Sequence, residues 1–190
     1  FAEVDKAFGM WENTGIASIL YAIKAYPGFT FFGVDPSEPM LEVCRTRLAA
    51  AGILDRCELL QGYVDDISAG EPFDAVLSIL VGHFVEPPQR PDFYRSLVNR
   101  ARSGGYVVNC EISFDLDSAE FPLMLETWRQ VQSLMGASPE SLANLAQILR
   151  APLTVLSPRD VEDYLRQSGV KPVRFFQAFM IVGWYGIKEG

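Results

Sequence analysis

The sequence predicts an α/β fold in which helices cover both faces of a mostly parallel sheet with an antiparallel last strand. Apolar, strand-like runs alternate with helical patterns over residues 15–114, as in parallel strands joined by helical crossovers. The run 73–80 is interrupted only by Asp74 and Ser78, which is typical of a central strand covered on both faces. With 190 residues, the chain is predicted to be a single domain, 1–190, with a sizeable core.

The composition favours a small-molecule partner and a cytoplasmic location. The formal net charge of −8 is opposite to the positive surface that nucleic-acid binding requires, so no nucleic-acid partner is expected. No apolar run reaches membrane-spanning length, no signal-peptide pattern opens the sequence, and no membrane partner is expected. Cys44, Cys57 and Cys110 are widely spaced and odd in number, which predicts reduced core thiols and neither a disulfide framework nor a metal site.

Helical spacing and helix-ending residues predict the helices and strands that precede the run 73–80. They are, in order, an amphipathic helix 1–11, a helix 16–25, a strand 30–35, a helix from Ser37 to Gly52 and a strand 57–63. Tyr-Pro-Gly at 26–28 ends the second helix. Ser37 is a favoured N-cap residue and Gly52 is a favoured residue just after a helix. The apolar positions between them repeat at helical spacing: Met40, Leu41, Cys44 and Leu48.

After the central run, the same patterns predict a helix 91–102, a strand 106–114, a helical insertion 115–156, a helix 157–169, and strands 173–181 and 182–188. One side of the first of these helices is apolar, and Ser-Gly-Gly at 103–105 closes it. Ser157 and Pro158 supply a cap and a first helical residue. The last two strands are too close together for a helical crossover, so they should pair antiparallel through a turn near Gly183.

The insertion 115–156 contains two helical segments, split near 136–139, with no strand between them. Both segments carry an apolar stripe, which most often packs into a core. The stripes consist of Phe121, Met124, Leu125, Trp128, Val131 and Met135, and of Leu142, Leu145, Ile148 and Leu149. An insertion after the carboxyl end of a strand also lies where a substrate lid is built, so a lid is the second interpretation.

Residues 30–40 contain the strongest single indication of function. A short apolar run ends in Asp35, and a helix starts at once. Ligands of open α/β sheets bind beyond the carboxyl ends of the strands, where an acidic residue can accept hydrogen bonds from both ribose hydroxyls. Asp35 is therefore a candidate for ribose binding, although a strand-ending aspartate can instead cap the following helix.

The sequence resembles the class I S-adenosylmethionine-dependent methyltransferases in three stretches that occur in the family's order. These are Gly-Val-Asp-Pro-Ser-Glu-Pro-Met-Leu-Glu at 33–42, Leu-Leu-Gln-Gly at 59–62 with Phe-Asp-Ala-Val-Leu-Ser at 73–78, and Ser-Gly-Gly-Tyr-Val-Val at 103–108. The resemblance implies a Rossmann-like sheet and S-adenosylmethionine as cofactor. The cofactor-binding residues that it implies are Asn13, Thr14, Gly15, Asp35, Pro36, Ser37, Met40, Tyr63, Val64, Asp65, Ser78, Ile79 and His83.

Two departures from the family pattern concern the two ends of the cofactor. Only Asn13-Thr14-Gly15 resembles the glycine turn that follows the family's first strand. Either residues are missing from the sequence between about Trp11 and Asn13, or the turn is degenerate, and the first is favoured because a sheet without its central strand would expose two edges. The second departure is Tyr63, which stands where the family often has an acidic residue for the adenine amino group.

The contacts of Tyr63 and its neighbours leave alternatives for the adenine. The tyrosine ring can stack on or flank the purine, and the backbone N–H of Val64 can bind the purine ring whatever its side chain. Asp65 and Asp66 are alternative acceptors for the amino group.

Within the class, Phe-Phe-Gln-Ala-Phe at 175–179, Phe-Val-Glu-Pro at 84–87 and the insertion resemble carboxy-S-adenosylmethionine synthases and their methyltransferase relatives. In those synthases, an Arg and a Tyr in the insertion hold the extra carboxylate. The matching stretch 133–138 reads Ser-Leu-Met-Gly-Ala-Ser. Because an unpaired carboxylate is costly to bury, the resemblance implies the architecture of the synthases and not their activity.

Methyl transfer needs few catalytic residues because the cofactor supplies the reactivity. His83, just past the fourth strand, and Glu111, near the end of the fifth, are the candidate general bases. His83 is equally compatible with packing, and Glu111 with a satisfied or solvated carboxylate. Ser78 can reach the cofactor or satisfy the backbone. Three aromatic residues line an acceptor pocket or belong to the core: Phe84, Tyr94 and Trp128.

These observations predict an S-adenosylmethionine-dependent methyltransferase that acts on a small molecule beneath the insertion. Three alternatives share its sequence features. A Rossmann-type dehydrogenase would use the ribose-binding acid for NAD. A carboxy-S-adenosylmethionine synthase-like enzyme would share the architecture. A degenerate, non-catalytic module would bind a cofactor, or form a homodimer through its C-terminal strands and insertion.

Overall fold

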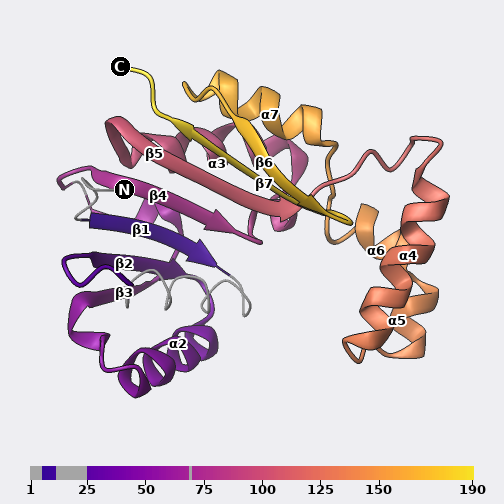
Figure 1. Ribbon diagram of the computed structural model, residues 1–190, viewed down its shortest axis with the longest axis horizontal. Coiled ribbons are helices and arrows are strands. Elements are labelled where there is room, and N and C mark those ends of the chain that lie inside the picture. The colour runs from indigo at the N-terminus through magenta and orange to yellow at the C-terminus, as the bar shows by residue number, and fades with distance from the viewer. Residues whose placement is uncertain (1–5, 12–24, 69) are drawn as a thin grey trace.

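A computed structural model describes residues 6–11, 25–68 and 70–190. The described residues form a seven-stranded sheet in the order β3-β2-β1-β4-β5-β7-β6. Its strands are β1 (Lys6–Trp11), β2 (Thr30–Asp35), β3 (Cys57–Gln61), β4 (Phe73–Ile79), β5 (Ala101–Ile112), β6 (Val173–Ala178) and β7 (Ile181–Ile187). Strands β1 to β5 run parallel, and β7 is antiparallel to both of its neighbours. The predicted sheet is confirmed (Figure 1).

Strand β1 corrects the prediction that residues 1–11 form an amphipathic helix. It lies at the centre of the sheet, with Ala7 opposite Phe31 of β2 and Ala75 of β4. Pairing on both sides satisfies the backbone of a short segment, and this tertiary environment overrides a helical apolar pattern. The sequence therefore contains its central strand, and the argument for missing residues before Asn13 no longer holds. Residues 12–24, including the predicted glycine turn and most of the helix 16–25, lie outside the described residues.

Helices cover both faces of the sheet, as predicted. On one face, α2 (Glu38–Ala50) packs Cys44 and Leu48 against Phe31 and Ala75. On the other face, α3 (Arg90–Asn99) packs its apolar side against β2, β4 and β5. Helix α7 (Pro158–Gln167) lies beside α3 and covers β7. Residues that alternate along one strand therefore belong to two different cores.

The two serines predicted to cap helices differ in the hydrogen bonds that their side chains make. Ser157 Oγ accepts a hydrogen bond from the Asp160 N–H at 3.2 Å, so it caps α7 as expected. Ser37 is the N-cap residue of α2, but its side chain makes no capping hydrogen bond. Instead, a carboxylate oxygen of Asp35 accepts from the Ser37 N–H at 2.7 Å. The prediction that the Ser37 side chain caps α2 was therefore wrong.

Several boundaries differ from prediction. The helix predicted at 91–102 ends at Asn99, so Ser-Gly-Gly at 103–105 lies in β5 and does not close it. Strand β5 begins at Ala101 and not at residue 106, since a register shift opposite Phe73 and Ala75 accommodates a turn in which Gly104 has φ +73°. The β6–β7 turn lies after Ala178, not near Gly183.

Gly183 has a different role, because it lies within β7 beneath two aromatic rings. A Cβ atom there would lie 2.4 Å from Cε1 of Phe176 and 3.0 Å from Cε1 of Phe175. The glycine therefore makes room for these rings on the sheet.

The insertion forms a helical unit of its own, with one break more than predicted. It contains α4 (Phe121–Leu134), α5 (Pro139–Ala143) and α6 (Leu145–Arg150), because the second predicted segment is divided at Asn144. The first predicted stripe, except the exposed Met135, packs into one core with the ends of β5 and β7. Leu145 and Leu149 of the second stripe belong to the same core. Figure 1 shows the insertion beyond the tips of the β4 and β5 arrows, at the carboxyl edge of the sheet. No helix in the described part of the chain is long and apolar enough to cross a membrane.

Candidate functional site

Asp35 ends β2 with one carboxylate oxygen engaged and the other available. Its Oδ1 accepts from the Ser37 N–H, and the described residues donate no hydrogen bond to Oδ2. Partial burial raises the pKa of the Asp35 carboxyl above its ordinary value, while the hydrogen bond from Ser37 acts in the opposite direction. The capping and ribose-binding interpretations are therefore compatible, because each can use one oxygen.

The segment after β3 lies next to Asp35 at the same edge of the sheet. Asp35 is opposite Gln61 in the register of β2 and β3, and its backbone carbonyl accepts from the Gly62 N–H at 3.1 Å. Gln61 Nε2 donates to the Pro36 carbonyl at 3.3 Å. These contacts bring the two predicted cofactor-binding segments, 35–40 and 63–65, together.

Within the second segment, the side chains differ in what they can offer a ligand. Tyr63 is 62% exposed, and Asp65 is exposed as well. Asp66 is engaged in the turn, because its Oδ2 accepts from the Tyr63 N–H at 2.8 Å. The Val64 side chain is buried in the core. Tyr63 and Asp65 are thus the accessible side chains for an adenine, and Asp66 is the weaker alternative.

Around the first segment, Pro36 is exposed, whereas Ser37 and Met40 are half-buried at the start of α2. We call Asp35, Pro36, Ser37, Tyr63 and Asp65 the cofactor edge. Asn13, Thr14 and Gly15, which were predicted to join it, lie outside the described residues.

The end of β4 is more enclosed than the cofactor edge. Ser78 is fully buried, and its hydroxyl has no hydrogen-bond partner among the described residues. It alternates with Ile79, which is half-buried on the opposite face. Leu80 follows with φ 59°, an unfavourable conformation for a non-glycine residue, and its N–H donates to the Cys110 carbonyl at 2.6 Å. Strained backbone of this kind is concentrated at functional sites.

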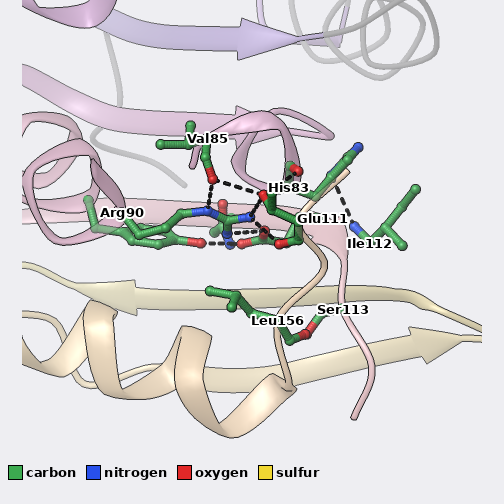
Figure 2. A network of polar contacts seen from close by, with 10 residues as sticks. His83, Val85, Arg90, Glu111, Ile112, Ser113 and Leu156 are labelled. Atoms are coloured by element: carbon green, nitrogen blue, oxygen red, sulfur yellow. Dashed lines mark hydrogen bonds and ion pairs between the residues drawn. The ribbon is translucent and has the colours of Figure 1, made fainter. Parts of the chain in front are cut away.

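His83 lies buried in the loop after β4 and is only 1% exposed. Its Nδ1 accepts from the Ile112 N–H at 3.3 Å (Figure 2). Burial, and then the nearby positive charge of Arg90, lower the pKa of His83 to about 4. The imidazole is therefore neutral near pH 7, and the lone pair that a general base would use is already engaged by Ile112.

Glu111 is equally engaged, within a buried polar network. Its Oε2 lies 3.0 Å from Nη1 of Arg90, and both side chains are fully buried. Its Oε1 accepts from the hydroxyl of Tyr94 and, at 2.9 Å, from Nδ2 of Asn109. Burial and the Glu111 charge raise the pKa of Tyr94 well above its ordinary value, so the phenol keeps its proton. We call Arg90, Tyr94, Asn109, Glu111 and His83 the buried network (Figure 2).

Packing around the network explains one glycine in the loop after β4. A Cβ atom at Gly82 would lie 2.6 Å from Oε2 of Glu111. Only glycine therefore lets this backbone approach the carboxylate so closely.

Arg90 is a member of the network that the sequence analysis did not predict. Arg90, Tyr94, Leu97 and Val98 follow helical spacing and are the buried residues of α3. A charged residue on an otherwise apolar stripe is the signal that could have revealed it. Glu111 gives the matching signal on β5, where it alternates in register with buried positions.

Of the three predicted pocket aromatics, only one is accessible. Phe84 is 45% exposed, and its ring packs on His83 with centroids 4.5 Å apart. Tyr94 is fully buried in the network, and Trp128 is buried in the core of the insertion. Phe84 is thus the aromatic side chain that an acceptor can contact at the end of β4.

This sheet order defines a Rossmann-like α/β protein. Its polar residues gather at the carboxyl ends of β2, β3 and β4, the edge at which open α/β sheets bind ligands. A family model described as "Methyltransferase domain" matches residues 13–105. The family match, the relatives and the fold support a class I S-adenosylmethionine-dependent methyltransferase.

Two relatives are carboxy-S-adenosyl-L-methionine synthases. The one from Methylococcus capsulatus is 24% identical over 95% of this chain and 75% of its own length. The one from Campylobacter hominis is 23% identical over 77% of this chain and 62% of its own length. The match thus spans less than two thirds of the Campylobacter hominis protein.

Among solved structures, the fold resembles an O-methyltransferase family 2 protein from Planctomyces limnophilus in complex with apigenin. The TM-score is 0.71 at 16% identity, over 96% of this chain and 50% of that one.

The residues described here fit S-adenosylmethionine, the cofactor of this family. Asp35 offers a carboxylate oxygen for the ribose, and the exposed Tyr63 and Asp65 flank it for the adenine. The residues of the cofactor edge are neutral or acidic. This charge suits a cationic cofactor that has no phosphate groups.

Proposed function

We propose that this chain is a methyltransferase domain that transfers the methyl group of S-adenosylmethionine to a small molecule. The observation that carries the proposal is Asp35 at the carboxyl end of β2, next to the strand β1 at which the strand order reverses, with one carboxylate oxygen to which the described residues donate no hydrogen bond. The family match and the apigenin complex of the Planctomyces limnophilus protein support it. We further propose that the chain is one cytoplasmic domain and that residues 115–156 cover the acceptor.

In this proposal, the chain binds and orients the cofactor and the acceptor and excludes water from them. The cofactor supplies an activated methyl group. Asp35 holds the ribose, Tyr63 flanks the adenine and Asp65 accepts from its amino group. The acceptor lies between Phe84 and the insertion, where its nucleophilic atom can be aligned with the methyl group. His83 and Glu111 position the loop after β4 and do not take a proton, because their acceptor atoms are engaged.

Asp35→Ala tests the proposal directly. Titration calorimetry with S-adenosylmethionine should show at least about tenfold weaker binding, because hydrogen bonds to a charged group contribute about 1.5–3 kcal/mol. Asp55→Ala is the matched control, since Asp55 is exposed beside the amino end of β3, at the opposite edge of the sheet. Absence of binding heat with the unmodified protein, or equal affinities for both variants, would contradict the proposal. Thermal shifts with S-adenosylmethionine and NAD distinguish the dehydrogenase alternative, because only the bound cofactor stabilises the fold.

A carboxy-S-adenosylmethionine synthase-like activity is the second candidate, favoured by the two similar synthases. The stretch 133–138 lies at the end of α4, where Leu134 is 89% exposed and no Arg or Tyr is present. Mass spectrometry of the ligand released from purified protein distinguishes the two. A carboxylated cofactor would favour the synthase activity, and unmodified S-adenosylmethionine the methyltransferase.

A non-catalytic binding or dimerisation module remains the third candidate. Phe175, Phe176 and Tyr185 are exposed on the C-terminal hairpin, and such side chains are frequent at interfaces. Light scattering of the free protein tests whether this chain forms a homodimer. A dimer without cofactor binding would favour this candidate over the methyltransferase.

A further inference from the structure

Arg90 connects three segments that lie far apart in the sequence. Its Nε donates to the Val85 carbonyl at 2.6 Å in the loop after β4, and its Nη1 pairs with Glu111 on β5. Its Nη2 donates to the carbonyl of Thr154 at 2.9 Å and lies 3.3 Å from the Thr154 hydroxyl. Thr154 belongs to residues 153–156, which we call the return segment because they lead from the insertion back to α7. The planar guanidinium thus binds β5, the loop and the base of the insertion at once (Figure 2).

The hydroxyl of Thr154 adds a second link between the return segment and the loop. It can donate to the carbonyl of His83 at 3.1 Å or of Val85 at 3.0 Å, while accepting from Arg90. Thr154 has φ 36°, which is unusual for a β-branched residue and is maintained by surrounding contacts. Two residues further on, the Leu156 carbonyl accepts from the Ser113 hydroxyl and from the Phe114 N–H. The return segment is therefore hydrogen-bonded to the loop on one side and to the end of β5 on the other.

The opposite end of the insertion makes no hydrogen bond to the sheet or to the loop after β4 among the described residues. Leu134 and Met135, at the end of α4, are 89% and 70% exposed. Between the two ends, the helices pack on Ile112, Met180 and Ile181 through apolar side chains. Apolar contacts are non-directional, so they hold the insertion close to the sheet without fixing its orientation. The directional bonds are concentrated at its base.

We propose that Arg90 and Thr154 form an anchor that fixes the orientation of the insertion relative to the loop after β4, and hence the shape of the acceptor site between them. This inference rests on the proposed function, in which the acceptor lies at that place. Arg90 is a positioning residue in this role, since it contacts neither the proposed cofactor edge nor solvent. Arginine suits the task because its five donors form a rigid fork, whereas lysine presents a single charged point. Glu111 compensates the charge that burial of this fork requires.

Hydrogen exchange in the protein without ligand tests the anchor with two variants of one residue. Thr154→Val removes the hydroxyl and keeps the size, whereas Thr154→Ser keeps the hydroxyl and serves as the conservative control. We expect amides of Phe114 and Val155 to exchange about fivefold to tenfold faster in the valine variant, as loss of a buried hydrogen bond predicts. The amide of Ala51, the C-cap residue of α2, should change by less than about twofold. The serine variant should match the unmodified protein at all three.

Two results would overturn the anchor. One is unchanged exchange at Phe114 and Val155 in the valine variant. The other is an equal increase at these amides and at Ala51, which would show that Thr154 contributes to global stability only. Because exchange is measured without S-adenosylmethionine, its outcome is independent of cofactor binding. Calorimetry of the valine variant with S-adenosylmethionine should give an affinity within about twofold of the original, since the Thr154 hydroxyl bonds Arg90 and the loop after β4 and makes no hydrogen bond to Asp35.

Discussion

The cofactor edge and the buried network both lie near the carboxyl ends of the strands, yet they differ in what their polar groups can do. Asp35 is half-buried and keeps one oxygen free of the described residues, and Tyr63 and Asp65 face solvent. Glu111 is fully buried and its two oxygens accept three hydrogen bonds. The difference shows that a carboxylate at a strand end is a candidate for ligand binding only when it is accessible and has an unoccupied lone pair.

The largest expected effect comes from a substitution that removes Glu111 from the buried network. Glu111→Ala leaves Arg90 buried without its partner, which should lower the free energy of unfolding by about 3–5 kcal/mol. Urea unfolding at pH 7 measures the change. Glu58→Ala, at an exposed position on β3, should stay within about 0.5 kcal/mol. The double variant Arg90→Met with Glu111→Met should lose less than Glu111→Ala alone, because it leaves no uncompensated charge. A loss below about 1 kcal/mol in Glu111→Ala would remove the contrast between the regions.

A smaller effect should follow from pH, through the only histidine of the chain. The pKa of His83 is about 4 in the folded protein, against an ordinary value of 6.5. As the pH falls below 6.5, the unfolded state binds a proton before the folded state does, so the stabilisation present above pH 6.5 is lost progressively toward pH 4. Between pH 7 and pH 5 this amounts to about 2 kcal/mol.

Urea unfolding at both pH values, compared with His83→Asn, isolates the contribution of the imidazole. Asparagine can accept from the Ile112 N–H through its side-chain oxygen but does not titrate. The variant should therefore lose less stability on acidification than the unmodified protein. Parallel curves for the two proteins would contradict the burial of a neutral His83.

The smallest expected effect is a difference between Ser157 and Ser37, the N-cap residues of α7 and α2. Ser157→Ala should cost about 1 kcal/mol, because the hydroxyl caps α7. Ser37→Ala should cost only a few tenths of that, since the Ser37 side chain makes no capping hydrogen bond at α2. Thermal unfolding of the two variants at one pH compares them. Equal losses would show that the side chains of the cofactor edge also carry folding stability.

Most of the fold followed from local patterns, and the main error occurred where local patterns conflict with tertiary context. Residues 30–35 were predicted as a strand and form β2 with the same bounds. Residues 1–11 have a helical apolar pattern, yet residues 6–11 form the central strand because both neighbours in the sheet supply hydrogen-bond partners. Those partners are far away in sequence, so no local window contains them.

The part of the site that was predictable consists of polar residues at the ends of predicted strands. Asp35 was identified because an acidic residue closes a strand before a helix. The engagement of Glu111 was not predictable, since it depends on Arg90 reaching across from α3 to β5. That of His83 was not predictable either, since it depends on the backbone N–H of Ile112. The sequence does indicate the pair of Arg90 and Glu111, because they are oppositely charged residues at positions that otherwise carry buried side chains.

The central position of β1 also determines the order in which the sheet can be assembled. During synthesis, β1 emerges first, but its second neighbour, β4, becomes available only after β2 and β3 have been made. Pairing between segments so distant in sequence is slow, because chain entropy is lost before contacts compensate for it. In the hydrogen-bonded sheet, the halves β3-β2 and β4-β5-β7-β6 are joined by this six-residue strand. Assembly of this sheet therefore depends on a segment that must remain unpaired on one side until β4 arrives.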